Sequence, residues 1–252
     1  MSLFWLDHYA HRSSPMHRWD ARYKLVGLSA LLLAMSAVND LRLAPVMLAL
    51  AAGCFLLSRL PLSFLLSRLR YPGFFLLAVV VLVPLMSGET VLVQFGWLGV
   101  RQEGLVLMLV IVTRFVSILT VSIVLFGTQP FVKSVQAMGA LGLPPLLTDM
   151  ILFFYRYLSD MAAMLMQMQQ AMWLRGFQAN RLSSLPAYAA LMGSLLLRSY
   201  AQSERVYLAM RLRGYGAAPR SRGQFGATGY DRAALALALV CAAGLVAASW
   251  WL

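Results

Sequence analysis

Five apolar runs divide the chain, and they determine the class of protein to which it can belong. They cover residues 25–38, 41–57, 73–87, 105–127 and 233–252. The fourth and fifth reach the roughly 20 residues that an α-helix needs to cross a bilayer core of about 30 Å. The first three are shorter, so flanking residues or a locally thinner bilayer would have to make up their length. We therefore expect an all-α polytopic membrane protein with about five transmembrane helices.

The composition excludes a soluble cytosolic protein. Hydrophobic residues make up 61% of the 252 residues and charged residues only 12%, whereas soluble domains carry about a quarter charged residues. Both cysteines, Cys54 and Cys241, lie inside apolar runs, so the sequence contains neither a disulfide framework nor a Cys-x-x-Cys pair. We expect them to act as small apolar side chains.

The basic residues predict the orientation of the chain. There are 21 of them against nine acidic residues, which gives a net charge of +12. In a chain this apolar they must lie in loops and at membrane edges, so no nucleic-acid partner is expected. Eighteen fall in residues 1–24, 58–72 and 128–232, and only Arg42 and Arg101 fall in the two intervening loops. Because basic residues favour the cytoplasmic side, we expect a cytoplasmic N-terminus and an external C-terminus.

This orientation divides the chain into three regions. Residues 1–127 form an N-terminal membrane region with four spans, residues 128–232 a cytoplasmic segment, and residues 233–252 a C-terminal transmembrane helix. Within the first region, residues 58–70 have the polar and leucine faces of a helix that lies in the membrane interface. Residues 90–101 alternate loosely and predict a strand-like external loop.

The cytoplasmic segment is predicted to be helical. Helical patterns cover residues 130–141, 146–174 and 186–213, and the sequence Gly-Leu-Pro-Pro at 142–145 separates the first two. Both long helices are too apolar to stand alone in water. They must pack on each other, on the membrane or on a partner protein.

The two long helices end in nearly the same sequence. Residues 171–177 read Ala-Met-Trp-Leu-Arg-Gly-Phe and residues 209–215 read Ala-Met-Arg-Leu-Arg-Gly-Tyr, so five of seven positions are identical. In each copy the Ala, Leu and Arg share one helix face, because they are spaced i, i+3 and i+4. The residues expected to dock on a partner are Ala171, Leu174, Arg175, Gly176, Ala209, Leu212, Arg213 and Gly214.

Two interpretations of these motifs are open. Ordinary helix capping explains an arginine in the last turn followed by a glycine. Capping does not by itself require the shared Ala-Met or the aromatic residue in the seventh position. The repetition therefore favours a pair of matched projections that enter two equivalent pockets, as on a dimer of similar subunits.

At these residues the chain resembles the transmembrane coupling (T) component of an energy-coupling factor (ECF) ABC transporter. That family carries two short arginine motifs, each at the end of a long cytoplasmic coupling helix. The N-terminal residues Asp7-His8-Tyr9-Ala10 and Asp20-Ala21-Arg22-Tyr23-Lys24-Leu25 are similar to the signature of its cobalt and nickel branch, the CbiQ-like proteins. Ala21 stands where that signature usually has proline.

The resemblance implies a non-catalytic subunit of a cobalt or nickel importer in a bacterial or archaeal plasma membrane. Its partners would be two ABC ATPase subunits and a substrate-capturing membrane (S) subunit of the CbiM type, with or without a small accessory membrane subunit. The chain itself has no G-x-x-x-x-G-K-[ST] phosphate-binding loop, so ATP would be hydrolysed on the ATPase partners and no cofactor is expected. A T component of a vitamin-type ECF importer is the alternative.

Four polar residues require separate consideration. His8, His11 and His17 invite a metal site, but they lack an Asp or Cys cluster at ligand spacing, and we expect surface histidines. Arg114 lies ten residues into the fourth apolar run. An ionisable residue at such a depth suggests a functional site, and pairing with backbone carbonyls or with another subunit is the alternative.

Two other classes of protein are compatible with a polytopic chain. An integral-membrane lipid or prenyl transferase would need clustered acidic residues to hold a metal–pyrophosphate group. Asp149 and Asp160 share a helix face but are eleven residues apart, or roughly 16 Å. A passive membrane scaffold is the third class, and co-purification with an ATPase would separate it from a coupling subunit.

Overall fold

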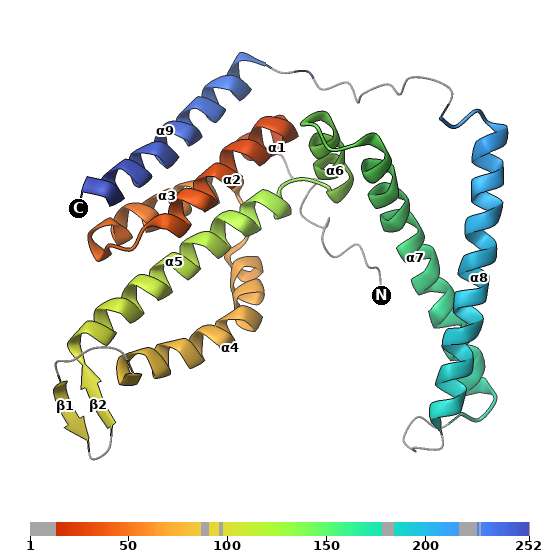
Figure 1. Ribbon diagram of the computed structural model, residues 1–252, viewed down its shortest axis with the longest axis horizontal. Helices are drawn as coiled ribbons and strands as arrows, with labels where there is room; N and C mark the ends of the chain where they lie inside the picture. The colour runs from red at the N-terminus through yellow and green to blue at the C-terminus, as the bar shows by residue number, and fades with distance from the viewer. Residues whose placement is uncertain are drawn as a thin grey trace. The chain divides into compact units, whose positions relative to one another are not determined.

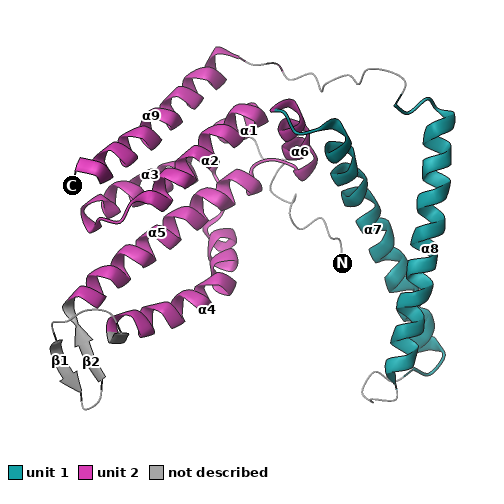
Figure 2. Ribbon diagram, in the orientation of Figure 1, with its two compact units in different colours: residues 1–5, 142–224 teal, residues 6–141, 225–252 magenta. Residues whose placement is uncertain are grey.

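The computed structural model describes residues 14–86, 91–95, 98–177, 184–216, 226 and 228–251. These residues form two compact units (Figure 2), and each is considered by itself. The bundle unit contains the described residues up to Leu141 and from Gly226 onward, and the helix-pair unit contains those from Gly142 to Gly216. The all-α fold class is confirmed.

The bundle unit consists of helices and one short hairpin (Figure 1). Its elements are α1 (Pro15–Arg18), α2 (Ala21–Ala37), η2 (Leu41–Leu43), α3 (Ala44–Ser58), α4 (Leu62–Met86), β1 (Val91–Phe95), β2 (Leu98–Arg101), α5 (Gln102–Gly127), α6 (Phe131–Ala140) and α9 (Gly229–Trp251). Helix α2 packs against both α9 and α5, so the first long helix lies beside the last one. The core between them includes the buried Leu28, Met35, Val121 and Val124.

Among the described residues, four helical segments are long and apolar enough to cross a membrane. They are Leu41–Ser58, Leu62–Pro84, Glu103–Gly127 and Gly229–Trp251. The first expected span corresponds to α2, which has 17 residues and is therefore about 25 Å long. It packs against α5, α6 and α9, and Met35 within it is fully buried.

Four helix ends lie together at one end of the bundle. Arg18 and Arg59 line the same cavity, so the beginning of α2 and the end of α3 are adjacent and the two helices form the hairpin expected around Asn39. A hydrogen bond from Lys24 to Thr128 adds the end of α5. A hydrogen bond from Trp19 to the carbonyl of Asp231 adds the start of α9.

The segment predicted as an interfacial helix, residues 58–70, is helical from Leu62 onward but does not form a separate element. Residues Leu62–Met86 form one helix, α4, which also contains the third expected span as far as Met86. Pro72 lies inside this helix, and Figure 1 shows α4 bent. Proline removes a backbone N–H and clashes with the preceding turn. A proline between the two predicted segments therefore fits a bend in one helix rather than a break between two helices.

The strand-like character predicted for residues 90–101 is confirmed in the residues that the structure describes. Strands β1 and β2 pair in antiparallel fashion, with Val93 opposite Val100 and Phe95 opposite Leu98. They connect α4 to α5.

The helix-pair unit contains α7 (Pro145–Leu174) and α8 (Leu185–Leu212). The predicted boundaries, 146–174 and 186–213, therefore agree within one residue. With 30 and 28 residues, the helices are roughly 45 and 42 Å long. Most of their apolar side chains are exposed, and Leu191 is the buried residue of α8.

Candidate functional site

The first motif ends α7 with a Schellman cap. The N–H of Gly176 donates to the carbonyl of Trp173 at 3.0 Å, and the N–H of Phe177 donates to the carbonyl of Met172 at 3.2 Å. Gly176 has φ +82°, a left-handed conformation that glycine adopts without a Cβ penalty. This cap stops the helix directly after Arg175.

The second motif ends α8 in the same way. The N–H of Gly214 donates to the carbonyl of Arg211 at 3.0 Å, and the N–H of Tyr215 donates to the carbonyl of Met210 at 3.0 Å. Gly214 has φ +73°. The two helix ends therefore have the same hydrogen-bonding pattern, and they present the residue before the glycine, Arg175 or Arg213, in the same local geometry.

All eight residues that the sequence assigns to docking are exposed. Leu174 is 90% exposed and Leu212 is 89% exposed. An exposed leucine beside an arginine is compatible with a contact surface. Within the described residues neither Arg175 nor Arg213 forms an ion pair, so both guanidinium groups can contact a carboxylate of a partner.

The seventh residue of each motif contacts the other helix of the unit. The ring of Phe177 packs edge-on against Tyr188, with centroids 5.2 Å apart. The hydroxyl of Tyr215 donates to Asp149 at 2.5 Å. The aromatic residues thus have a role inside the unit, in the position that follows a Schellman glycine. They also show that α7 and α8 are antiparallel, with the two motifs at opposite ends of the pair.

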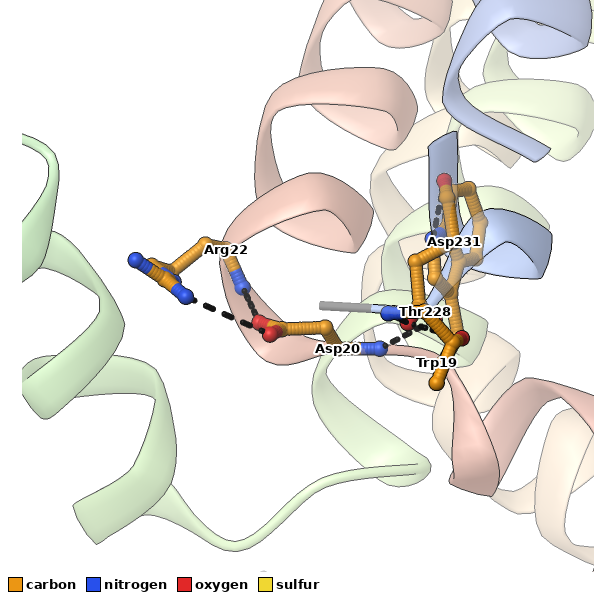
Figure 3. A network of polar contacts seen from close by, with 5 residues as sticks. All are labelled: Trp19, Asp20, Arg22, Thr228 and Asp231. Atoms are coloured by element: carbon orange, nitrogen blue, oxygen red, sulfur yellow. Dashed lines mark hydrogen bonds and ion pairs between the residues drawn. The ribbon is translucent and has the colours of Figure 1, made fainter. Parts of the chain in front are cut away.

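The N-terminal signature forms a buried polar network with the start of α9 (Figure 3). The backbone N–H of Asp20 donates to the carboxylate of Asp231 at 2.9 Å, and the indole of Trp19 donates to the Asp231 carbonyl at 3.3 Å. Thr228 donates to the other carboxylate oxygen from its N–H at 2.8 Å and its hydroxyl at 2.5 Å. Asp20 itself caps α2 by accepting the N–H of Arg22 at 3.0 Å.

Lys24, from the same signature, is buried with 1% of its surface exposed. Its ammonium group donates to the carbonyl of Met16 at 3.0 Å and to the hydroxyl of Thr128. The Thr128 hydroxyl in turn donates to the carbonyl of Val124 at 2.6 Å. Burial lowers the pKa of Lys24 from 10.5 to about 7, because removal from water disfavours the charged form.

Sequence reasoning did not find the roles of Lys24, Thr128 and Asp231. A usable signal was present for Asp231, which is an acidic residue at the very start of an apolar run. Its partners Trp19 and Asp20 are more than 200 residues away, so their identity could not be read from local spacing.

Arg114 contacts the end of α2. Its guanidinium donates to the carbonyl of Val38 and to the side-chain oxygen of Asn39, the latter at 2.7 Å. Val38 is the C-cap of α2, so Arg114 satisfies a backbone acceptor that the helix leaves without an intrahelical partner. Of the two interpretations of Arg114, this geometry supports pairing with a backbone carbonyl.

The described residues contain no group of three or more His, Cys, Asp or Glu side chains that could hold a metal ion. His17 is hydrogen-bonded to Ser14 at 2.6 Å. His8 and His11, together with the signature residues from Asp7 to Ala10, lie outside the described residues. The structure presents two exposed helix ends with the same local geometry and a set of buried hydrogen bonds that connect the helices of the bundle.

Comparisons with known proteins agree with these features. Residues 12–224 match the CbiQ family, described as a cobalt transport protein. The chain is 27% identical over 222 residues to the energy-coupling factor transporter transmembrane protein EcfT of Lacticaseibacillus paracasei, a match that covers 83% of this chain and 84% of the relative. It is 25% identical over 266 residues to EcfT of Brevibacillus brevis, covering 98% and 97%. EcfT of Lactococcus lactis subsp. cremoris is 26% identical over 224 residues, covering 83% and 84%.

Proposed function

Since the chain belongs to the CbiQ family and is the non-catalytic transmembrane component of an ECF transporter, we propose that its two motifs bind the ATPase subunits. The observation that carries this proposal is the pair of matched helix ends. Each has an exposed leucine next to an arginine that is presented by the same glycine cap. The two ends lie at opposite ends of an antiparallel helix pair, which suits one motif on each subunit of an ATPase dimer.

The proposed mechanism follows from the length and stiffness of these helices. ATP binding would close the two ATPase subunits and shift the ends of α7 and α8 relative to each other. Continuous helices of 30 and 28 residues carry such a displacement over roughly 40 Å without loss, because their backbone hydrogen bonds are internal. The displacement would reach the substrate-capturing membrane subunit and change its access to the substrate.

For the substrate we propose cobalt or nickel. The proposal is supported by the N-terminal signature and by the description of the matching family as a cobalt transport protein. A substrate-capturing subunit of the CbiM type would then be the partner that binds the ion, with or without a small accessory subunit. A vitamin-type importer is the alternative, since the names of the relatives specify no substrate. Uptake of labelled cobalt by membranes containing the complex separates the two.

We further propose that residues 1–127 and 233–252 are the membrane regions and that residues 128–232 lie in the cytoplasm. The distribution of basic residues supports a cytoplasmic N-terminus and an external C-terminus. The ends of α3 and α5 and the starts of α2 and α9 lie at one end of the bundle, which suits a single cytoplasmic face. A bacterial or archaeal plasma membrane is the proposed location.

Photo-crosslinking tests the proposed ATPase contact. A benzophenone amino acid replaces Leu174 or Leu212, and each variant is purified with its ATPase partners and irradiated. Both positions should crosslink to an ATPase subunit. Leu197 is 72% exposed and lies in the middle of α8, so it is the matched control and should not crosslink. Equal crosslinking at Leu197, or none at the two motifs, contradicts the proposal.

A further inference from the structure

A cavity of about 260 Å³ lies between the beginning of α4 and the end of α5 in the bundle unit. Two residues line it from α4 and four from α5: Phe64, Arg68, Ser122, Ile123, Phe126 and Gly127. The two helices approach closely here, since a Cβ on Gly127 would lie 3.3 Å from the ring of Phe64. A volume below the roughly 300 Å³ of drug-sized sites suits one group of a larger molecule that extends beyond the cavity.

The cavity lies at the end of two membrane segments. Both α4 and α5 contain helical segments long and apolar enough to cross a bilayer. Arg68 is five residues before the apolar run 73–87, and Gly127 is the last residue of the run 105–127. Five residues of helix span roughly 7.5 Å, which is about the thickness of the headgroup layer on each side of the hydrocarbon core. The cavity is therefore at the depth where phospholipid phosphates lie.

Arg68 supplies hydrogen-bond donors to this cavity. Its guanidinium lies over the ring of Phe64, 5.4 Å from the ring centroid. This cation–π contact restrains the side chain but uses no hydrogen-bond acceptor. Within the described residues Arg68 forms neither a hydrogen bond nor an ion pair, and no acidic side chain is among those that line the cavity. The N–H groups of Arg68 therefore remain for an anionic ligand.

The α5 side of the cavity adds a hydroxyl group and apolar walls. Thr113 and Thr120 each donate to a carbonyl of their own helix, whereas Ser122 forms no such bond among the described residues. Ile123 and Phe126 form the apolar wall, and Phe126 is 61% exposed. One arginine, one hydroxyl and otherwise apolar walls match the phosphate and the upper acyl chain of a lipid. A free phosphate ion would leave the apolar walls without a partner.

We propose that this cavity binds an anionic phospholipid of the bilayer, with the phosphate on Arg68 and Ser122. The acyl chains would lie along α4, whose exposed apolar side chains include Leu77 and Val81. A guanidinium binds a phosphate through planar, charge-assisted hydrogen bonds. A zwitterionic lipid fits less well, because the described lining residues contain no carboxylate for its cationic group. The site uses no residue of the two ATPase-docking motifs, so either proposal can fail alone.

Lipid retention is the first test. The full chain is extracted from nanodiscs that contain equal amounts of phosphatidylglycerol and phosphatidylcholine, and bound lipid is measured by native mass spectrometry. The wild-type protein should retain phosphatidylglycerol. Arg68→Gln should lower this retention about fivefold, in keeping with the attraction between one basic residue and an anionic membrane. Arg68→Lys should restore part of it, because lysine keeps the charge but lacks the planar fork. Arg70→Gln is the matched control, because Arg70 is an exposed arginine of α4 that does not line the cavity.

Photo-crosslinking is the second test, and it reports where the lipid binds. A benzophenone amino acid replaces Phe126, which lines the cavity, or Phe75, which is 71% exposed on α4 and does not line it. The assembled complex is irradiated in the same nanodiscs. Lipid adducts at position 126 should be enriched about fivefold in phosphatidylglycerol over the bulk mixture, and Arg68→Gln should abolish this enrichment. Adducts at position 75 should follow the bulk composition in both backgrounds.

Each result supports or overturns the proposal. Equal retention of both lipids, or adducts at position 126 that follow the bulk composition, shows that the cavity selects no anionic lipid. Retention of phosphatidylglycerol without enriched adducts at position 126 places the lipid elsewhere on the protein and also overturns the proposal. Adducts of position 126 to the substrate-capturing subunit, in place of lipid, would make the cavity a protein interface. Displacement of the lipid by inorganic phosphate alone would show a site for a free anion, whereas competition only by a long-chain alkyl phosphate supports recognition of the whole lipid.

Discussion

Lys24 and Asp231 place ionisable groups inside the protein, and each connects segments that are far apart in the chain. Lys24 connects α1 with the end of α5, and Asp231 connects the start of α2 with the start of α9. A buried charged group is tolerated where hydrogen bonds replace its hydration. The N-terminal signature is therefore explained, in the part that the structure describes, by its role as a joint between helices.

The lowered pKa of Lys24 predicts how stability depends on pH. The folded protein releases this proton near pH 7, whereas the unfolded chain holds it up to about pH 10.5. Between these values the unfolded state binds more protons, so the free energy of unfolding should rise with pH, by at most about 1.4 kcal/mol per unit. Thermal unfolding in detergent at several pH values measures this. Lys24→Met should lack the rise, and parallel curves for the two proteins would contradict the assignment.

Arg114 should contribute to stability through its contact with the end of α2. Arg114→Leu removes a charged donor from the Val38 carbonyl and from Asn39, and this loss should cost about 1.5–3 kcal/mol. Arg114→Lys should restore part of it, because an ammonium group can contact one acceptor but lacks the planar fork. Thermal unfolding and the yield of assembled complex provide the measurement. Arg42 is an exposed arginine near the same turn, and Arg42→Leu should change neither the thermal stability nor the yield of complex. An equal effect of Arg42→Leu would show that loss of any positive charge in this region destabilises the protein, and it would contradict a specific role of Arg114.

At the scale of elements, the glycine caps determine where α7 and α8 end. A Cβ on Gly176 or Gly214 would meet no atom within 4 Å, so its cost comes from the positive φ alone. Gly176→Ala and Gly214→Ala should each destabilise the helix end by about 1–2 kcal/mol and weaken ATPase binding, although both arginines remain.

Gly193 provides the matched control for this prediction. It also has open space around it, but it lies inside α8 with a helical backbone. Gly193→Ala should therefore stabilise the helix by about 0.5–1 kcal/mol and leave ATPase binding unchanged. Hydrogen exchange of the last turns, combined with a binding assay, distinguishes the two kinds of variant. If all three variants behave alike, the caps do not position the motifs.

Element boundaries were predictable where the sequence contains strong local signals. The helical pattern of apolar residues predicted α7 and α8. Their limits were indicated by the Gly-Leu-Pro-Pro sequence at 142–145 and by the glycine in each motif. Local signals were insufficient for α4, because the proline at position 72 bends a helix instead of ending it. For α2, the apolar run at 25–38 predicted the helix, and the observed helix begins earlier, at Ala21.

At the scale of the whole molecule, the candidate docking site comes from the motif that the sequence repeats. The repeated motif identified eight residues, and all of them are exposed. The antiparallel arrangement of the motifs could not be predicted, because it depends on contacts of Phe177 and Tyr215 across the helix pair. The hydrogen bonds that connect the helices of the bundle could not be predicted either, because a pair such as Asp20 and Asp231 is separated by 211 positions in the sequence.

The orientation of the whole chain can be tested with reporter fusions. A reporter after Leu252 should be external, and one inserted near Gly223 should be cytoplasmic, because basic residues gather on the cytoplasmic side. A reporter at the N-terminus should also be cytoplasmic. Activity of alkaline phosphatase and fluorescence of green fluorescent protein measure the two sides. N- and C-terminal reporters on the same side would contradict the proposed topology.

The central claim, that Arg175 and Arg213 connect this subunit to its ATPases, is tested most directly by charge reversal at both positions. Membranes carrying Arg175→Glu/Arg213→Glu are solubilised, and ATPase pull-down is measured together with ion uptake. The variant should insert normally, lose at least tenfold in ATPase association and lose transport, because a desolvated charge contact at an interface is worth a few kcal/mol. Arg198→Glu, at an exposed arginine in the middle of α8, should keep both activities. Normal pull-down and uptake in the double variant would show that the two motifs only cap their helices.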